Sequence, residues 1–493
     1  MWLAESYQYS PDFKELTVKT RQGITWSDGE PFSAHDVAYT FNMLRELGPK
    51  VIWGTETQMF VDSVNATDDN TVVFKFKVPA PRFFDFVTYK YDIGVYIAPK
   101  HIYDGQDWTS FRNWDLAKGW PVTTGPWRVV AASPESKLFD RRDEWWAVKQ
   151  GLVPRMPAME RVIWVPLADE TAATQAMIRN EVDHTHAKVE LTKQAVEQNP
   201  KVTTHSGRQS PYGYVDWWPL SLYVNCSRKP FDDKDVRWAL SYYINREQII
   251  EIGYSGEGSL WPVPMPSYPP LRPYVDAIKD LLEQYNTLEY NPEKGDALLT
   301  NKGWKKGDDG IWVSADGTRL SMEITGYSFM AGYGPVLVEQ LRQHGVECEY
   351  TMPTNAYDLF SKGEYTGSIF GHGGSIKDPY DTLALYISAN LSIPGAHQVN
   401  FPKWVNKEYD EIVNQVYQTP PDDKEKLLEL YHKAMEIWLP ELPDIVLTEF
   451  YHNIMRNETY WKNWPTKDVN DYVNEASWHL TWNVVLWNLE PAQ

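Results

Sequence analysis

The sequence predicts an α/β protein built from more than one domain. Short runs that alternate apolar and polar residues, typical of strands, are separated by helical patterns, and alternation on this scale favours α/β layering. The chain has 493 residues, which is more than one hydrophobic core usually supports, so two or three domains are expected. Charged residues make up 23% of the chain and the mean hydropathy is −0.50, as in ordinary soluble globular proteins.

The first elements are expected near the start of the chain. Residues 16–20 alternate as a half-exposed strand, and Ser27-Asp28-Gly29 supplies residues that tolerate a tight reversal. Ser33 stands three residues before Asp36, which is the spacing of a capping box at a helix start. We therefore expect a helix over residues 34–47.

Further along, the same patterns predict strands and helices in alternation. The expected strands cover residues 71–77, 127–130, 162–165 and 346–350, and the expected helices cover residues 170–180, 236–243, 335–344 and 422–438. The apolar run at 162–165 is of the kind found in fully buried strands. Asp316-Gly317 is a hairpin signal between residues 311–313 and 320–324.

Charge and composition exclude several classes of partner. The net charge of −20 repels phosphate backbones and no basic stripe offsets it, so nucleic acid is not expected as a partner, nor is a bulk anionic membrane surface. No run of about 18 apolar residues is present, and residues 1–5 lack the features of an export signal. Cys226 and Cys348 are far apart in sequence, and either two free thiols, which we favour, or one bridge is compatible with them.

No pattern in the sequence indicates a catalytic or metal site. The run Gly371-His372-Gly373-Gly374 lacks the ending and the spacing of a phosphate-binding loop. His184 and His186 have no third ligand near them in sequence. Neighbouring carboxylates such as Asp143-Glu144 are better suited to helix capping than to the facing pair that a glycosidase needs. No enzyme activity, metal or cofactor is expected.

Aromatic residues are the unusual part of the composition. The chain contains 23 tryptophans and 30 tyrosines. Many of these must lie in the core, because large aromatic side chains contribute much buried area. Some tryptophans are nevertheless grouped in sequence rich in glycine and proline, and exposed aromatic platforms suit the flat C–H faces of sugar rings.

Several segments in order resemble one known family. They are Leu3-Ala4-Glu5-Ser6, Trp26-Ser27-Asp28-Gly29-Glu30-Pro31, Ala34-His35-Asp36-Val37, Thr124-Gly125-Pro126-Trp127, Arg142-Asp143-Glu144-Trp145-Trp146, Pro230-Phe231-Asp232-Asp233 and Asp378-Pro379. This chain resembles the extracellular solute-binding proteins of bacterial ABC importers, in the family with oligopeptide-, dipeptide-, nickel- and oligosaccharide-binding members. The similarity runs nearly from end to end.

The resemblance implies a two-lobed α/β fold of the type II periplasmic-binding-protein class with an extra inserted domain. The implied organisation is an inserted domain at 1–120, a first lobe at 121–220, a second lobe at 221–458 and a return to the first lobe at 459–493. The chain begins where family members are already some way in, so we expect an N-terminally truncated first lobe without export signal or lipid anchor. The implied setting is the periplasm or the extracellular side.

The ligand is predicted from one position. Peptide-binding members resemble one another in an aspartate before the Asp-Pro landmark that pairs with the peptide ammonium, and here Ser375 stands at that place. A buried ammonium without a carboxylate is costly, so peptide is disfavoured unless Asp378 or another acid substitutes. The tail at 460–466 also looks like that of oligosaccharide-type members.

The interpretation is a monomeric, non-enzymatic receptor that closes on an oligosaccharide and delivers it to ABC permease subunits. An oligopeptide receptor is the close alternative, and a secreted glycoside hydrolase is the alternative of another class. The candidate ligand-binding residues are Tyr214, Trp217, Trp218, Tyr223, Asn225, Trp261, Trp53, His372 and Ser375.

Overall fold

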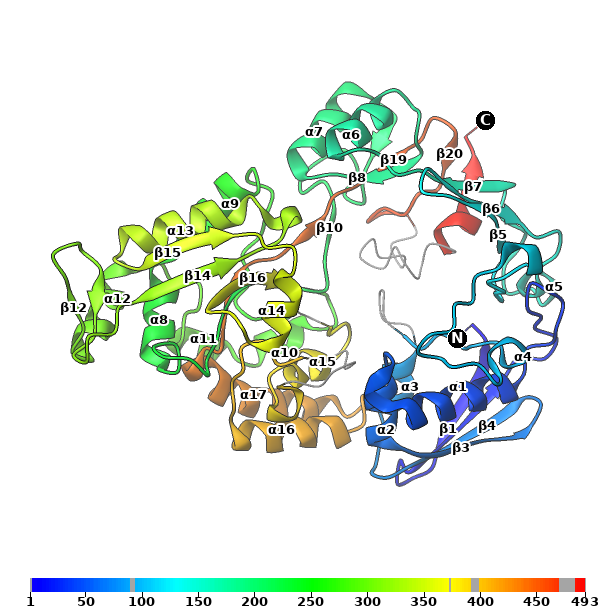
Figure 1. Ribbon diagram of the computed structural model, residues 1–493, viewed down its shortest axis with the longest axis horizontal. Helices are drawn as coiled ribbons and strands as arrows, with labels where there is room; N and C mark the ends of the chain where they lie inside the picture. Colours follow the sequence, from blue (N-terminus) through cyan, green and yellow to red (C-terminus); the bar gives the residue numbers. More distant parts are fainter. Residues whose placement is uncertain (1, 89–93, 372–373, 392–398, 470–483, 493) are drawn as a thin grey trace.

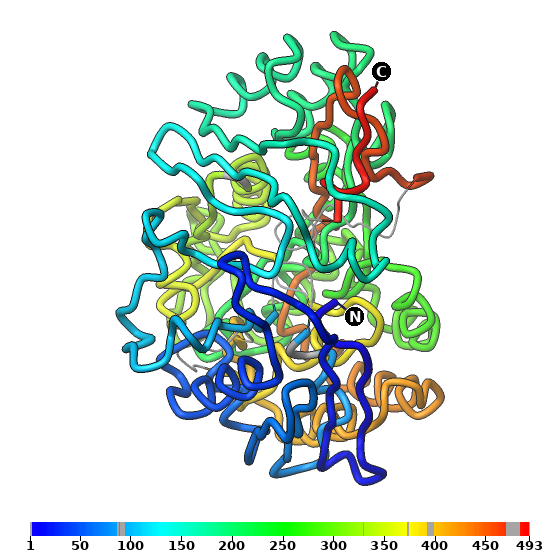
Figure 2. Tube along the Cα trace, turned by 90° about the vertical axis from the view of Figure 1, so that its right-hand side faces the viewer, coloured from blue at the N-terminus to red at the C-terminus, as the bar shows by residue number. Residues whose placement is uncertain are grey.

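The computed structural model describes residues 2–88, 94–371, 374–391, 399–469 and 484–492. Figure 1 shows a mixed α/β chain whose elements gather in three groups: the N-terminal segment at lower right, the segment around β5 to β8 at the top and right, and the middle of the chain at left. In Figure 2 the N-terminal segment lies at the bottom and the C-terminal end lies at the top.

The N-terminal group is a four-stranded antiparallel sheet in the order β1-β2-β4-β3, which we call the N-terminal sheet. Its strands are β1 (Ala4–Tyr9), β2 (Glu15–Thr20), β3 (Val61–Asp68) and β4 (Thr71–Phe76). Helix α1 (Ala34–Leu47) packs against β3 and β4 through Val37, Phe41 and Leu44. The capping box of Ser33 and Asp36 is present, which confirms the helix start expected from the sequence. Short helices α2 (Gly54–Phe60), α3 (Phe83–Val87) and α4 (Lys100–Tyr103) complete the group.

The next sheet has three antiparallel strands in the order β5-β6-β7. They are β5 (Trp127–Ala132), β6 (Lys137–Arg141) and β7 (Arg161–Trp164), and α5 (Trp146–Lys149) lies between β6 and β7 in the chain. The expectation that 162–165 is a fully buried strand is wrong: Ile163 is 56% exposed and Val165 is 47% exposed. The reason is position, because β7 pairs with β6 on one side and is the edge strand of this sheet.

Helices α6 (Glu170–Ile178) and α7 (Val189–Gln198) pack on another three-stranded sheet, in the order β8-β19-β9. Its strands are β8 (His184–His186), β9 (Val202–Thr203) and β19 (Ile454–Asn457). Strand β19 comes from near the end of the chain and pairs with β8 and β9, so the C-terminal part returns to this group (Figure 1). The pair β20 (Trp461–Lys462) and β21 (Glu490–Pro491) follows.

The middle of the chain forms a five-stranded sheet in the order β15-β14-β16-β11-β17, which we call the large sheet. Its strands are β11 (Leu220–Val224), β14 (Ser321–Thr325), β15 (Glu347–Thr351), β16 (Gly367–Gly371) and β17 (Asp444–Thr448). Its helices are α8 (Lys234–Tyr242), α9 (Arg246–Gly253), α10 (Arg272–Asp276), α11 (Lys279–Gln284), α12 (Pro292–Asn301), α13 (Tyr333–Gln343), α14 (Ala356–Lys362), α15 (Tyr380–Ala384), α16 (Lys407–Gln418) and α17 (Lys424–Glu441).

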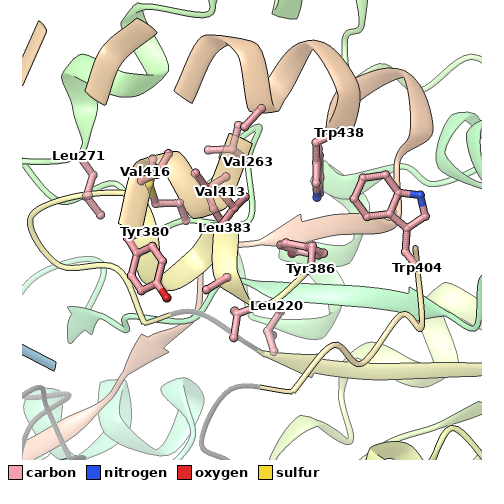
Figure 3. Close-up of a cluster of buried hydrophobic side chains, with 14 of the residues drawn as sticks. Leu220, Val263, Leu271, Tyr380, Leu383, Tyr386, Trp404, Val413, Val416 and Trp438 are labelled. Carbon is pink, nitrogen blue, oxygen red and sulfur yellow. The ribbon is translucent and has the colours of Figure 1, made fainter. Parts of the chain in front are cut away.

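The core of this group lies between the large sheet and helices α15 to α17. Figure 3 shows Trp438 of α17 and Trp404 around Tyr386, with Leu220 of β11 on the sheet side. Burial of such aromatic side chains is worth several kcal/mol of the hydrophobic driving force, at about 25 cal/mol per Å².

The hairpin expected around Asp316-Gly317 forms only in part. The turn is present, with Gly317 N–H donating to Ser314 O and a bridge between Val313 and Arg319. Strand β13 (Trp312–Val313), however, pairs with β12 (Lys305–Lys306), whereas β14 pairs in parallel with β15 and β16. Met322 and Ile324 are buried in the large sheet, and that burial outweighs the local pairing that the turn suggested.

A two-stranded antiparallel ribbon connects the groups, formed by β10 (Tyr214–Val215) and β18 (Tyr451–His452). We call it the crossover ribbon. In Figure 1, β10 lies between the large sheet and the sheet of β8 and β19. The domain limits expected from the sequence stay a prediction.

Two further expectations concern cysteine and membranes. Cys226 and Cys348 are free thiols, which settles the alternative that the sequence left open. Within the described ranges, none of the helices has the length and apolar character that crossing a bilayer demands.

Candidate functional site

The crossover ribbon is held by the buried side chain of Asp216. The backbone N–H of Asp216 donates to Phe450 O at 2.8 Å, and Oδ1 of Asp216 accepts the N–H of Trp217 at 2.6 Å. Its Oδ2 forms an ion pair with Nε2 of His452 on the opposite strand. A buried carboxylate with these partners fixes the direction in which the chain leaves the ribbon.

Trp217 and Trp218 follow directly and lie beside Gly371 and Gly374, which together with Ser375 we call the glycine loop. The Trp218 ring lies against the backbone of Gly371, where a Cβ atom would come within 1.8 Å of ring atom Cε3. The same ring packs on Phe370 and Phe450, with centroid distances of 5.4 and 5.7 Å. A Cβ on Gly374 would lie 3.6 Å from the Trp217 ring. Both tryptophans are half-buried, and glycine is required at 371 for Trp218 to pack this closely.

Tyr214 lies on the first strand of the crossover ribbon. Its ring is 4.5 Å from the ring of His205 and 5.9 Å from that of Tyr268. The hydroxyl of Tyr268 donates to Val215 O at 2.9 Å, which ties the proline-rich loop to the ribbon. Burial lowers the pKa of His205 to about 3, with Arg456 nearby adding to the effect, so this imidazole is neutral beside Tyr214.

Trp261 belongs to the same proline-rich loop as Tyr268. It is half-buried, and its Nε1 is buried without a hydrogen-bond partner among the described residues. A buried indole N–H normally finds an acceptor, so this donor lacks the partner that burial usually requires.

The polar residues of the glycine loop and its end are bonded within the protein. Ser375 is fully buried, and its Oγ accepts the N–H of Thr382 at 3.0 Å. Asp378 pairs with Arg82, with 3.3 Å between Nε and Oδ2. Position 375 has no carboxylate, and the carboxylate at 378 is paired with Arg82. His372, also expected here, lies outside the described residues.

Three other expected ligand residues are placed in the interior. Tyr223 is 1% exposed and packs on Phe360 at 5.4 Å. Asn225 is fully buried, and its amide donates to Gly363 O at 2.9 Å. Trp53 is 5% exposed within the N-terminal group. We leave these side chains out of the candidate site, because their surfaces are taken up by the protein.

The structure adds residues that the sequence did not indicate. Phe370, Phe450 and Tyr268 bring rings to Trp218 and Tyr214 from three distant segments. Arg82 reaches Asp378 from the N-terminal group. No local pattern marks these residues, since each is defined by its neighbours across the fold.

The other tryptophans that the sequence singled out lie elsewhere. Trp145 and Trp146 are buried, and both indole N–H groups donate to Thr124 O, at 2.8 and 2.7 Å. Trp2 and Trp487 pack against Trp145 at centroid distances of 5.5 and 5.7 Å. This cluster is core packing.

Side chains that could ligate a metal are dispersed. In the part of the chain that the structure describes, no three His, Cys, Asp or Glu side chains come together as a metal site. His184, whose spacing to His186 raised the question of a metal ligand, stacks on Trp464, and burial lowers its pKa well below 6.5. The candidate site is an aromatic surface at the crossover.

Comparison with known proteins identifies the family. The model of the bacterial extracellular solute-binding proteins, family 5, matches residues 1–392. The dipeptide-binding protein of Escherichia coli (strain K12) is 24% identical over 472 residues, covering 90% of this chain and 80% of the relative. The nickel-binding periplasmic protein of the same organism is 26% identical over 322 residues, covering 62% of this chain and 53% of the relative.

Solved structures share the fold. A periplasmic oligopeptide-binding protein of an ABC transporter from Thermotoga maritima, with mannohexaose bound, superposes with a TM-score of 0.83 at 22% identity, covering 99% of this chain and 90% of the other. The oligopeptide-binding protein AppA of Bacillus subtilis, in complex with a nonapeptide, gives a TM-score of 0.76 at 18% identity, with coverage of 99% and 90%. The expected two-lobed periplasmic binding-protein fold is thereby confirmed. The chain belongs to the bacterial extracellular solute-binding proteins of family 5, as a substrate-binding protein of an ABC transporter.

Proposed function

We propose that this protein captures an oligosaccharide between its lobes and delivers it to the permease of an ABC importer without transforming it. The family supports the role of a receptor. The protein would act outside the cytoplasmic membrane, as a monomer and without a cofactor. The choice of ligand rests on the aromatic surface at the crossover.

The single observation that supports an oligosaccharide is that Trp217 and Trp218 lie half-buried beside Gly371 and Gly374. Half-buried indole faces can stack on the C–H faces of sugar rings, and base stacking on aromatic rings, at about 1–3 kcal/mol per base, suggests the scale. A peptide would bring an ammonium group, which needs a carboxylate partner when it is buried. Asp378, three residues beyond Ser375, is already paired with Arg82.

Relatives support both this ligand and its alternative. The Thermotoga maritima structure holds mannohexaose, although the protein is described as an oligopeptide-binding protein. The names of curated relatives refer mostly to peptides. An oligopeptide is therefore the second candidate, favoured by the relatives and disfavoured by the paired state of Asp378.

Calorimetric titration separates the two candidates. Manno-, cello- and xylohexaose are titrated into the protein, and a mixture of di- to hexapeptides is titrated in parallel. A ligand present at 100 times its Kd stabilises the folded protein by about 2.7 kcal/mol, so thermal melting gives an independent signal. Heat and a raised Tm with a hexasaccharide are expected. A heat of binding that is seen with peptides and with none of the hexasaccharides would refute the proposal.

The tryptophans are then tested in turn. Trp217→Ala and Trp218→Ala should each weaken binding of the identified sugar by about tenfold, which corresponds to about 1.4 kcal/mol. Trp114→Ala is the matched control, because this tryptophan is 50% exposed and lies outside the candidate site. Wild-type affinity in both site variants would exclude the pair from the binding surface.

The same samples test the alternative of a hydrolase. Labelled hexasaccharide is incubated with the protein and the products are resolved by chromatography. Intact sugar is expected throughout. Release of shorter sugars in proportion to protein concentration would show an enzyme.

A further inference from the structure

The parallel strands of the large sheet end at one edge, and this edge continues the aromatic surface of the candidate site. Strand β14 is parallel to both β15 and β16, so the three carboxyl ends lie side by side. Strand β11 is antiparallel to β16 and pairs Leu220 with Gly371, which brings the segment of Trp218 to the same edge. In Figure 1, β14 runs from the outer end near β12 toward the middle of the molecule. Ligands of open α/β sheets bind outside the carboxyl ends of the strands.

The rings at this edge form a connected row. Phe370, near the end of β16, lies 5.4 Å from Trp218 between ring centroids. Phe370 also lies 5.0 Å from Tyr327, which follows β14, and 5.9 Å from Tyr357, which follows β15. Burial raises the pKa of Tyr327, and the nearby Tyr357 hydroxyl adds to that increase. Phe370 therefore joins Trp218 to a pair of tyrosines that the candidate site does not include.

The backbone before Tyr327 fixes where this side chain leaves the sheet. Gly326 N–H donates to Thr351 O at the end of β15, at 2.9 Å. A Cβ on Gly326 would come within 2.1 Å of the hydroxyl oxygen of Tyr350, so the two segments approach closely only because this residue is glycine. Met330 N–H donates to Tyr327 O at 2.9 Å and closes the turn that follows. Tyr327 is half-buried in this position.

Tyr357 presents open ring surface on a fixed support. It is the second residue of α14 and is 53% exposed. The same helix is anchored by Phe360, which is fully buried and stacks on Phe401 at 4.1 Å. The Tyr357 ring lies 6.1 Å from that of Phe401. A tyrosine held in this way offers a large contact area at a low cost in conformational entropy.

We propose that Tyr327 and Tyr357 form a second aromatic subsite, which binds a further sugar ring of an oligosaccharide that already occupies the crossover tryptophans. The inference rests on the proposed function and adds ligand length to it, because a chain that extends past Phe370 gains contacts that a shorter one lacks. Phenol rings can stack on the C–H faces of a sugar, and each hydroxyl can donate and accept a hydrogen bond. Both hydroxyls stay uncharged at neutral pH, since the pKa of each tyrosine is raised above 10 by burial.

Calorimetric titration with sugars of two lengths tests the subsite. Mannotriose and mannohexaose are titrated into wild type, Tyr327→Leu and Tyr357→Ala, and the cello- and xylo-sugars of the same lengths are measured alongside. Each variant should bind the hexasaccharide at least about fivefold more weakly, on the scale of stacking on one ring. Trisaccharide affinity should stay at the wild-type value, because the tryptophans alone accommodate the shorter chain.

Two control variants separate stacking from other effects. Tyr357→Phe keeps the ring, so its hexasaccharide affinity should stay within about twofold of wild type. Tyr290 is 46% exposed, close to the exposure of Tyr357, and its ring lies 6.1 Å from His344, just before β15 begins. Tyr290 is therefore at the opposite end of the strands, and Tyr290→Ala should leave both affinities unchanged. Circular dichroism and melting without sugar check folding, and Tyr357→Ala decides the test if Tyr327→Leu does not fold.

Several outcomes would overturn the subsite. Wild-type hexasaccharide affinity in a folded tyrosine variant would remove that residue pair from the binding surface. Equal losses for the trisaccharide and the hexasaccharide would show an indirect effect through Phe370 and Trp218. A loss in Tyr357→Phe as large as in Tyr357→Ala would contradict stacking on the ring. Failure of wild type to bind any of these sugars would instead refute the proposed function, and the subsite with it.

Discussion

Asp444 offers a quantitative test of the large sheet behind the candidate site. It begins β17, opposite Tyr223 on β11, and is fully buried. The hydroxyl of Tyr386 donates to its Oδ2 at 2.6 Å. Burial raises the pKa of Asp444 from 3.8 to about 6, and the hydroxyls of Ser221, Tyr386 and Tyr223 offset only part of that increase. The folded protein therefore binds the proton of Asp444 more tightly than the unfolded chain does.

The sign of the effect follows from the raised pKa. Protonated Asp444 contributes to the free energy of unfolding. This stabilising contribution is fully present below pH 3.8 and is lost as pH rises through about 6. Between pH 4.5 and 7.5 the free energy of unfolding should fall by about 2 kcal/mol from this group alone. Asp444→Asn removes the titration and keeps the shape, so its free energy of unfolding relative to wild type should rise by the same amount over that range.

Urea denaturation at pH 4.5 and 7.5, followed by tryptophan fluorescence, measures this difference. Tyr386→Phe is the companion variant, since it removes the hydroxyl that bonds Oδ2 at 2.6 Å and should raise the pKa of Asp444 further. A difference between wild type and Asp444→Asn that is the same at both pH values would refute the buried, neutral acid.

Three further predictions concern the crossover and the first lobe. Asp216→Asn removes the charge partner of His452 and should lower the free energy of unfolding by about 3 kcal/mol; a urea midpoint equal to that of wild type would contradict this. The pKa of His205 is lowered from 6.5 to about 3. The contribution of the neutral His205 ring to the free energy of unfolding is therefore present above pH 6.5 and is lost as pH falls. His205→Leu should make the loss of stability from pH 8 to pH 5 smaller by about 2 kcal/mol, and an identical loss would exclude burial of the neutral ring. Gly371→Ala places a Cβ within 1.8 Å of the Trp218 ring, so it should displace that ring and reduce sugar binding in a titration, while wild-type affinity would show that Trp218 does not contact the ligand.

Local elements could be predicted because their causes are local. Ser33 and Asp36 satisfy each other's backbone partners within one helical turn, so their spacing alone indicates where α1 begins. The ordered landmarks of the chain likewise indicated the family that the comparison then showed. The structure places Trp217 and Trp218 beside Gly371 and Gly374, and that they face a ligand stays a prediction.

The limits of prediction also have a physical cause. Trp217 and Trp145 look alike in sequence, yet one lies half-buried at the crossover and the other is enclosed by Trp2 and Trp487. Tyr223 was predicted to face the ligand, but the sheet turns it toward Phe360. No period or spacing separates these cases, because burial depends on which distant segments cover a side chain.

By itself, the sequence determined the α/β class, the capped helices, the family landmarks and the net charge of −20, since all of these depend on composition or on neighbours along the chain. Only the tertiary structure decided which aromatic rings are core, that residues 162–165 form an edge, and that Arg82 holds Asp378 at 3.3 Å. Those facts arise from contacts between segments far apart in sequence, where burial and the pairing of charges are settled by the fold as a whole.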